Sequence, residues 1–152
     1  MIQLPKRKHL PHEVPDWVAD GATYFITVNC RDRGKNQLAF QNVFEAIRNS
    51  AENYSSRGLW HIQLMVIIPD HIHSLVTFNT REKTINTIIG GWKRYLAKTQ
   101  AIVWQSNYFE HRIRNQNELI EKEAYIRQNP VRAELCVKED DWPYVIHNTS
   151  GQ

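Results

Sequence analysis

Two histidines separated by one residue are among the side chains in this sequence best suited to chemistry. His71 and His73 follow a Pro-Asp step in IIPDHIHSLVTF (67–78), a segment whose apolar residues otherwise predict a buried strand. In a strand, residues two apart point to the same face with Cβ atoms roughly 6.5–7 Å apart, so both imidazoles can converge on one metal ion while Ile72 packs behind them. Taken alone, the pair is equally typical of two structural histidines.

A second candidate lies in AYIRQNP (124–130), where Tyr125 and Asn129 stand four residues apart. On a helix this spacing puts both side chains on one face, one turn from each other. A tyrosine hydroxyl can serve as a nucleophile and an amide can bind a metal ion. A core tyrosine followed by a helix-ending asparagine has the same pattern, so both interpretations stay open at this point.

The pair of imidazoles suits Zn, Mn, Fe or Ni without distinguishing among them. No cysteine lies near the histidines in the sequence, which weakens the case for a structural zinc site. An oxygen ligand would favour an open site in which substrate oxygens complete the coordination.

The elements around these residues alternate between strand and helix patterns. Strands are predicted at 22–30, 60–70 and 71–78, with a strand or hairpin at 102–114, and helices at 40–54, 82–100 and 115–130. Only Pro69-Asp70 separates the second and third strands, which indicates an antiparallel hairpin. This order predicts an α+β fold, a ferredoxin-like antiparallel sheet with helices on one face.

Two features predict breaks in the helices. The pair Gly90-Gly91 is expected to interrupt the helix at 82–100, because each glycine lowers helix stability relative to alanine. Pro130 is expected to end the helix at 115–130, because a proline pushes the preceding residue out of the helical region. Asn115 or Asn117 is expected to cap the start of that helix.

Length and composition predict one globular domain. The chain of 152 residues is 41% hydrophobic and 23% charged, which argues against extensive disorder. We expect an extended N-terminal arm at 1–20, a single domain at 21–145 and a tail at 146–152. Cys30 and Cys136 form no C-x-x-C motif, and neither a leader segment nor a membrane span is apparent, so a cytoplasmic protein without a membrane partner is expected. The net charge of +3 permits nucleic-acid binding without indicating it.

Taken together, the motifs resemble those of the single-tyrosine HUH transposases, and most closely the REP-associated tyrosine transposases. The His-hydrophobe-His step after Pro-Asp, followed by Tyr-Ile-x-x-Asn-Pro, is specific in combination. The segments that carry the resemblance are ATYFITVNCRDR (22–33), MVIIPDHIHSLVTF (65–78), VWQSNYFEHRIRN (103–115) and AYIRQNPVRAEL (124–135). The similarity runs from about Leu10 to Tyr144, and it implies an HUH endonuclease core with a C-terminal tyrosine-bearing helix in a bacterial cytoplasmic protein.

The resemblance also implies a role for each residue of the two candidates. His71 and His73 would bind a divalent metal ion, Mg²⁺ or Mn²⁺, and Tyr125 would be the nucleophile. Its attack on single-stranded DNA beside a hairpin would leave a 5′-phosphotyrosine link and a free 3′-hydroxyl. A third metal ligand is expected one turn beyond the tyrosine, at Asn129, with Gln128 as the fallback.

Contacts to DNA are expected from basic and aromatic side chains, although a solvated charge or a core aromatic is as good an interpretation of each. Trp104 and Tyr108 are candidates for stacking on bases. The candidates for phosphate contacts are Lys6, Arg7, Lys8, Lys93, Arg94, Lys98, Arg112 and Arg114.

Three other functions compete with this one. The protein could be a domesticated hairpin-binding protein that no longer transposes, or a metal-dependent phosphoesterase that uses activated water and forms no covalent adduct. A non-catalytic RNA-binding module of ferredoxin-like fold is the third, but the strands lack its aromatic-rich signature. No feature of the sequence decides between a monomer and a homodimer.

Overall fold

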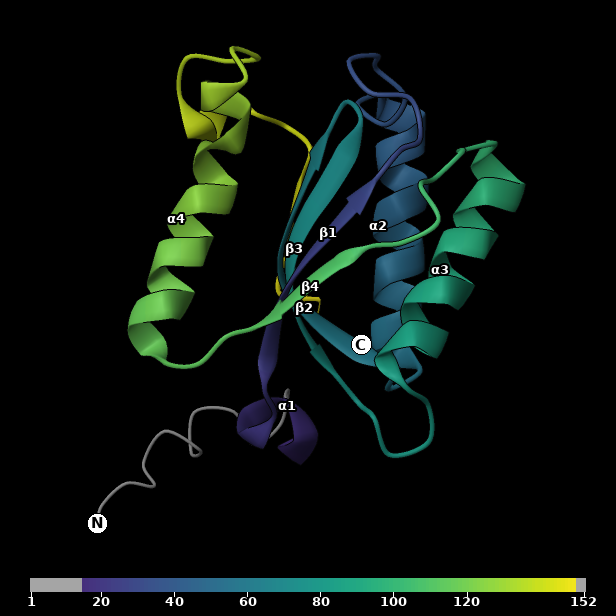
Figure 1. Ribbon diagram of the computed structural model, residues 1–152, viewed down its shortest axis with the longest axis vertical. Coiled ribbons are helices and arrows are strands. Elements are labelled where there is room, and N and C mark those ends of the chain that lie inside the picture. Colours follow the sequence, from purple (N-terminus) through teal and green to yellow (C-terminus); the bar gives the residue numbers. More distant parts are fainter. Residues whose placement is uncertain (1–14, 150–152) are drawn as a thin grey trace.

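A five-stranded antiparallel sheet lies at the centre of the molecule, with strand order β4-β1-β3-β2-β5 (Figure 1). The structure is a computed structural model and describes residues 15–149. The strands are β1 (Thr23–Asn29), β2 (Trp60–Ile68), β3 (His71–Phe78), β4 (Phe109–Arg112) and β5 (Val145–His147). The first four follow the ferredoxin-like order, and β5 extends the sheet beyond β2. The predicted hairpin at Pro69-Asp70 is confirmed by the antiparallel pairing of β2 with β3.

Helices cover both faces of this sheet. α2 (Gln41–Ser56) and α3 (Ile85–Gln100) pack on one face, and α4 (Gln116–Arg132) packs on the other (Figure 1). A short helix, α1 (Asp16–Asp20), precedes β1, and a 3₁₀ turn, η2 (Glu139–Asp141), follows α4. The predicted α+β class is therefore confirmed, with the tyrosine-bearing helix on the face opposite the two core helices. None of the helices within residues 15–149 is both long and apolar enough to cross a membrane.

Alternation along β3 divides the core between these two faces. Ile72 and Val76 pack into the cluster that includes α2 and α3, whereas Leu75 packs into a smaller cluster with Ile126 of α4. Because successive side chains of a strand point to opposite faces, residues 71 and 73 share the α4 face with Leu75. The register of β3 therefore turns both histidines toward the tyrosine-bearing helix.

The predicted interruption at Gly90-Gly91 is wrong, because α3 is continuous from Ile85 to Gln100. A Cβ atom on Gly91 would lie 3.2 Å from the hydroxyl oxygen of Tyr54 on α2. This glycine lets the two helices approach each other closely. The packing gained there offsets the low helix propensity of the residue.

The prediction that Pro130 ends its helix is also wrong. Asn115, one of the two expected capping residues, caps the start of α4. The helix continues through Pro130 to Arg132. Pro130 is buried and lines a small cavity with Val66 of β2 and Val145 of β5. Burial against the sheet holds the last turn in place, although the proline supplies no N–H to the carbonyl four residues earlier.

The expected boundaries of the arm and the tail are both too wide. Residues 16–20 form α1, where the N–H groups of Val18 and Ala19 donate to the carbonyl of Pro15. At the other end, Ile146 is buried and pairs with Met65, so the first residues of the expected tail belong to the sheet. A strand pairing with a distant segment leaves little signal in three residues. The candidate DNA contacts Lys6, Arg7 and Lys8 lie outside the described residues.

The two faces differ in how firmly their helices are anchored. α4 buries two residues, Ile126 and Pro130, whereas α2 and α3 bury five each. We expect the backbone amides of α4 to exchange with deuterium faster than those of α2 and α3, because fewer apolar contacts must break to open the helix. Hydrogen exchange followed by mass spectrometry measures this, and equal protection of the three helices would contradict it.

Candidate active site

His71 and His73 lie on the α4 face of β3, near the start of that strand. Their rings are 4.7 Å apart between centroids, and they pair across the sheet with Asn29 and Thr27 of β1. His73 is 6% exposed and stacks against Phe25 at 5.5 Å between ring centroids. The predicted convergence of the two imidazoles on one face is confirmed.

Hydrogen bonds to Nδ1 orient both rings. The Nδ1 atom of His71 lies 2.7 Å from Oδ1 of Asp70, and Nδ1 of His73 lies 2.8 Å from Oγ1 of Thr27. A carboxylate only accepts, so Nδ1 of a neutral His71 carries the hydrogen and its Nε2 presents a lone pair. Metal-bound histidines are typically held in this way by a partner on the other ring nitrogen.

Asp70 is the anchor of this arrangement. Its Oδ2 atom accepts from the backbone N–H of Gly34 at 2.8 Å and from Nε of Arg33 at 3.0 Å. Burial alone would raise the pKa of Asp70, but these hydrogen bonds and the one from His71 outweigh burial and lower the pKa to about 2. The carboxylate is therefore charged at neutral pH and ties His71 to the loop that follows β1.

Both histidines are neutral at physiological pH. Burial lowers the pKa of His73 to about 3, with smaller contributions from the nearby charges of His71, Arg132 and Arg33. Burial also lowers the pKa of His71, against the opposing effect of Asp70. Only a neutral imidazole has a lone pair to offer, so this state is the one that binds metal ions.

Tyr125 projects from α4 toward the same place. Its ring meets His73 and Phe25 edge-on, at 5.8 and 6.1 Å between centroids. The guanidinium of Arg132 lies 4.3 Å from the centroid of the tyrosine ring, and its Nη2 donates to the Tyr125 carbonyl at 3.0 Å. Tyr125 is nevertheless 47% exposed, so a nucleotide can approach it from solvent.

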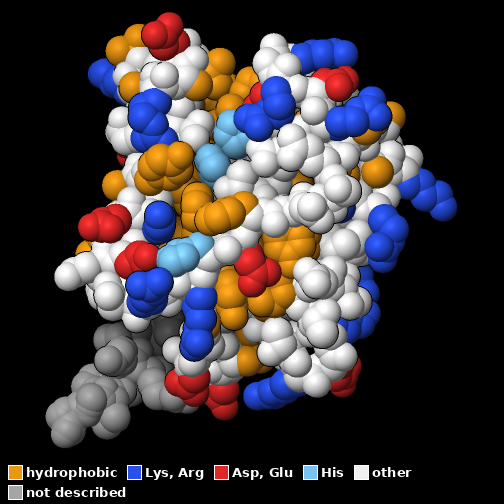
Figure 2. All heavy atoms as spheres, in the orientation of Figure 1, with side chains coloured by type: hydrophobic (Ala, Val, Ile, Leu, Met, Phe, Trp, Pro, Cys, Tyr) orange, Lys and Arg blue, Asp and Glu red, His pale blue; other side chains and the backbone are white. Residues whose placement is uncertain are grey.

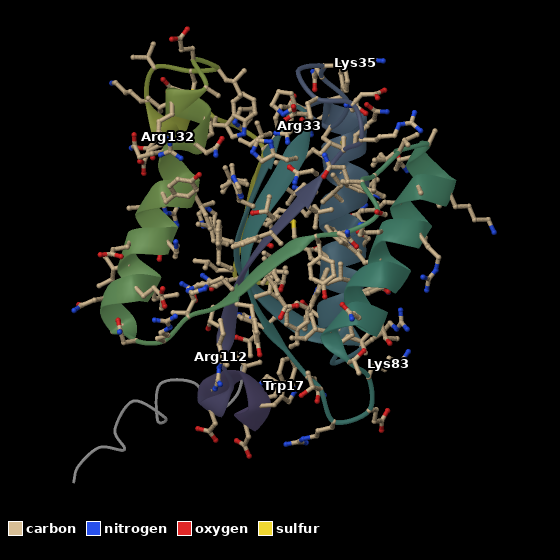
Figure 3. The ribbon with its side chains drawn as sticks, viewed as in Figure 1. Trp17, Arg33, Lys35, Lys83, Arg112 and Arg132 are labelled. Carbon is tan, nitrogen blue, oxygen red and sulfur yellow. The ribbon has the colours of Figure 1, made fainter. Side chains whose placement is uncertain are left out.

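Two arginines add positive charge on either side of the histidines. Arg132 stands at the end of α4 and Arg33 on the loop after β1, at the same end of the molecule (Figure 3). Figure 2 shows histidine side chains in a hollow between α4 and the sheet, with Lys and Arg side chains on both sides. Such a surface suits a phosphate group, because arginine binds phosphate oxygens with a planar fork of donors.

The two candidates for a third metal ligand differ in their surroundings. Asn129 is half-buried and follows Tyr125 by one helical turn, which places it on the same face of α4. Gln128 is exposed and donates from Nε2 to Glu139 of η2, so it is engaged away from the histidines. Within residues 15–149, no cluster of three or more His, Cys, Asp or Glu side chains could hold a metal ion.

Among residues 15–149, the expected DNA contacts do not gather around the histidines. Lys93 is buried, and its ammonium donates to the carbonyls of Gln105 and Asn107, so it supports a loop and offers no free charge at the surface. Trp104 is half-buried, with its indole N–H donating to the Lys93 carbonyl. The remaining candidates are exposed on α3, β4 and the turn before α4, namely Arg94, Lys98, Arg112 and Arg114.

Sequence reasoning missed the residues that support the site. Asp70 was noted only as part of a turn, although its place directly before His71 was a usable signal. Arg132 follows Tyr125 by seven residues, which is two helical turns on the same face, so its position could have been read from the helix period. The spacing of the sequence does not indicate the roles of Arg33 and Thr27, since Thr27 bonds His73 and Arg33 bonds Asp70 only through contacts between distant segments.

Proteins of similar sequence and structure include REP-associated tyrosine transposases. A REP-associated tyrosine transposase of Escherichia coli (strain K12) is 26% identical over 126 residues, covering 82% of this chain and 75% of the relative. A REP-associated tyrosine transposase solved bound to a REP hairpin superposes with a TM-score of 0.73 at 26% identity, covering 82% of this chain and 76% of that chain. This chain is similar to the REP-associated tyrosine transposases in both sequence and fold.

A second sequence relative agrees with this conclusion. A putative REP-associated tyrosine transposase of Haemophilus influenzae (strain ATCC 51907 / DSM 11121 / KW20 / Rd) is 29% identical over 142 residues, covering 82% of this chain and 78% of the relative. No protein-family profile matches the sequence. The resemblance to REP-associated tyrosine transposases inferred from the motifs is therefore confirmed by similarity in sequence and in fold over 82% of the chain.

The role of Asp70 can be tested through stability. Asp70→Asn should lower the free energy of unfolding by about 1–3 kcal/mol at pH 7, because it removes a charged acceptor from three donors. The pKa of Asp70 is lower in the folded protein than in the unfolded chain, so its contribution is complete above about pH 4 and is lost as the pH falls toward 2.

Urea unfolding at several pH values measures this difference, with Asp32→Asn as the matched control, because the Asp32 side chain is 52% exposed. Equal stability of the two variants at pH 7 would show that the Asp70 carboxylate does not anchor the loop.

Proposed function

We propose that this protein is a transposase that cleaves and joins single-stranded DNA beside a hairpin through a covalent bond to Tyr125. The observation that carries the proposal is that Tyr125 on α4 meets the oriented pair His71 and His73 from the opposite side of the same hollow. The solved relative bound to a REP hairpin supports a DNA hairpin as the substrate.

The residues present fit a divalent metal ion. His71 and His73 are neutral, are held through Nδ1 and share one face, and among residues 15–149 neither Nε2 has a hydrogen-bond partner. Asn129 is proposed as a further ligand, and substrate oxygens would complete the set. A bound Mg²⁺ or Mn²⁺ would withdraw charge from the scissile phosphate. Two nitrogen ligands favour Mn²⁺ of the two ions, because Mg²⁺ prefers oxygen.

Tyr125 would supply the nucleophile. Its hydroxyl oxygen forms a bond to the scissile phosphorus and the bond to the 3′ oxygen breaks, which leaves a 5′-phosphotyrosine and a 3′-hydroxyl. The proton lost by the phenol is balanced by the proton that the 3′ oxygen gains. Attack by a 3′-hydroxyl on the phosphotyrosine reverses the step and joins strands, so no nucleotide cofactor is needed.

Arg132 and Arg33 would hold the phosphate for this attack. Arg132 covers one face of the tyrosine ring and Arg33 is fixed by Asp70, so both guanidinium groups are positioned before the substrate arrives. Their charges also help to keep His73 unprotonated. Charged donors that are already in place bind the transferring phosphate without reorganisation during the reaction.

The covalent step predicts a specific effect of Tyr125→Phe. This variant should form no covalent adduct with a labelled single-stranded hairpin oligonucleotide taken from the flanks of its own gene, while binding the oligonucleotide about as tightly as the wild type. Denaturing gel electrophoresis after incubation with Mn²⁺ detects the adduct, and Tyr95→Phe, at an exposed tyrosine of α3, is the matched control.

Three outcomes separate this proposal from its competitors. Cleavage by Tyr125→Phe without an adduct would indicate a phosphoesterase that uses activated water. Hairpin binding without cleavage by the wild type would indicate a hairpin-binding protein that has lost the reaction. An adduct that persists in Tyr125→Phe would place the nucleophile at another residue.

The third ligand is tested by comparing two neighbouring amides. Asn129→Ala should raise the Mn²⁺ concentration needed for half-maximal adduct formation by about tenfold or more, because a ligand is lost. Gln128→Ala should leave it nearly unchanged, since Gln128 binds Glu139. A Mn²⁺ titration of the adduct yield measures both variants, and the opposite ranking would assign the ligand to Gln128.

A further inference from the structure

A pocket of about 760 Å³ lies away from the histidines, between α3 and the chain segment 102–110, hereafter the edge segment. Asn86, Gly90 and Arg94 of α3 form one wall, and Trp104 and Tyr108 of the edge segment belong to the other. Its volume is within the range of about 300–1,000 Å³ that is typical of ligand sites. We propose that this pocket holds one unpaired nucleotide of the DNA strand that passes through the active site.

Internal hydrogen bonds build the pocket without any ligand. α3 ends at Ala101, whose φ of 58° turns the chain back along the helix. The ammonium of Lys93 donates to the carbonyls of Gln105 at 2.8 Å and Asn107 at 3.3 Å, and its own carbonyl accepts from the indole of Trp104 at 3.0 Å. A buried lysine fixes the edge segment at a set separation from α3, so the pocket is preformed.

Gly90 leaves room in the pocket wall, because no contact within residues 15–149 requires a glycine there. A Cβ atom at Gly90 would meet a guanidinium nitrogen of Arg94 at 3.4 Å, an ordinary contact with a movable group. A mid-helix glycine lowers helix stability relative to alanine. Gly91, by contrast, is needed for the approach of Tyr54. The space beside Gly90 in the pocket wall is bounded by the movable guanidinium of Arg94, so a bound molecule can occupy it when that side chain shifts.

The lining groups match a nucleotide better than a simple anion. The half-exposed rings of Trp104 and Tyr108 offer faces for a base, and Arg94 is exposed and has no hydrogen-bond or ion-pair partner within residues 15–149. The hydroxyl of Tyr108 lies within hydrogen-bond distance of Oδ1 of Asn86 and of Oε1 of Glu110, the latter at 3.2 Å, and its one proton can be donated to either. These amide, hydroxyl and carboxylate groups can pair with the edge of a base, whereas Glu110 would repel a bare phosphate.

The hydroxyl of Tyr108 keeps its proton in this setting. Burial, followed by the nearby charge of Glu110, raises the pKa of Tyr108 to about 12. The group therefore remains a donor over the physiological range. Arg94 would pair with the phosphate of the same nucleotide.

The pocket lies within reach of the strand that occupies the active site. The backbone N–H of Gln105 donates to the carbonyl of Asn29 at 2.9 Å, and Asn29 pairs with His71 across the sheet. Two strand spacings separate the edge segment from β3, which is about 10 Å. Because the histidines face α4 and the pocket lies beside α3, the single strand must also pass around the β4 edge, so several nucleotides separate the two sites. A strand leaving the histidines over the β4 edge can place a nearby base in the pocket.

The test rests on the proposed function and uses binding without cleavage. Tyr125→Phe protein is titrated into a fluorescein-labelled hairpin oligonucleotide from the flanks of its gene, and into a series in which each single-stranded nucleotide in turn is abasic. Fluorescence anisotropy measures the affinity. One abasic position should weaken binding about tenfold or more, in line with the loss of one stacked base.

Filling the pocket should remove this dependence. Adding Gly90→Leu should weaken binding of the intact oligonucleotide by the same factor, and the critical abasic position should then have no further effect. Leucine favours helices, so thermal unfolding of this variant should occur at a temperature equal to or above that of the parent. The control is Thr99→Leu, at an exposed position of α3 outside the pocket, which should behave like the parent.

A second variant tests how the base is read. Tyr108→Phe keeps the ring but removes the hydroxyl, so it should reduce the discrimination among the four bases at the critical position while retaining most of the affinity. The nucleotide pocket would be disproved if Gly90→Leu left the affinity for the hairpin oligonucleotide unchanged. It would also be disproved if each abasic position had the same effect with and without Gly90→Leu. Either result would leave the transposase proposal intact. Failure of the parent to bind the hairpin would overturn both.

Discussion

The position of β3 between β1 and β2 is the constraint on which the candidate site depends. Antiparallel pairing on both sides sets the register of this strand, and the alternation of side chains then sends His71 and His73 to the α4 face while Ile72 enters the opposite core. A slip of one residue would exchange the two faces and bury the wrong set. The strongly apolar cores on both sides of the sheet make such a slip costly, so the fold itself sets the positions of the two histidines.

The turn before β3 reinforces this register. The carbonyl of Asp70 accepts from Cys30, and the carbonyl of Pro69 accepts from Gln37 and Leu38. Backbone and side-chain bonds therefore join the Pro69-Asp70 turn to the loop that carries Arg33. The histidines, Asp70 and Arg33 thus belong to one hydrogen-bonded unit, whereas Tyr125 and Arg132 belong to a helix with few buried residues. In the proposed reversible reaction such a division is useful, because Tyr125 can move relative to the fixed pair of histidines.

The two sides of the sheet carry different parts of the proposed DNA interaction. The α4 side holds the reacting groups, and the α3 side holds a preformed pocket lined by aromatic and amide groups. The edge segment connects them, because it pairs with the end of β1 beside the histidines and also forms the pocket wall. The charge of Lys93 does not make it a DNA contact, because its ammonium binds the carbonyls of Gln105 and Asn107 in the pocket wall.

Local patterns in the sequence were enough to predict the hairpin and the α+β class. They also predict the shared face of His71 and His73 and the helical spacing of Tyr125 and Asn129. Each of these features depends on residues that are near one another in the chain. Gly90-Gly91 and Pro130 were misjudged because helix propensity is a weak force that packing against Tyr54 and against the sheet outweighs. The partnership of Asp70 with Gly34, and of Tyr125 with His73, depends on contacts between segments distant in sequence. Only the folded chain brings those groups together, because burial and pairing across the sheet act through space and leave no fixed spacing along the chain.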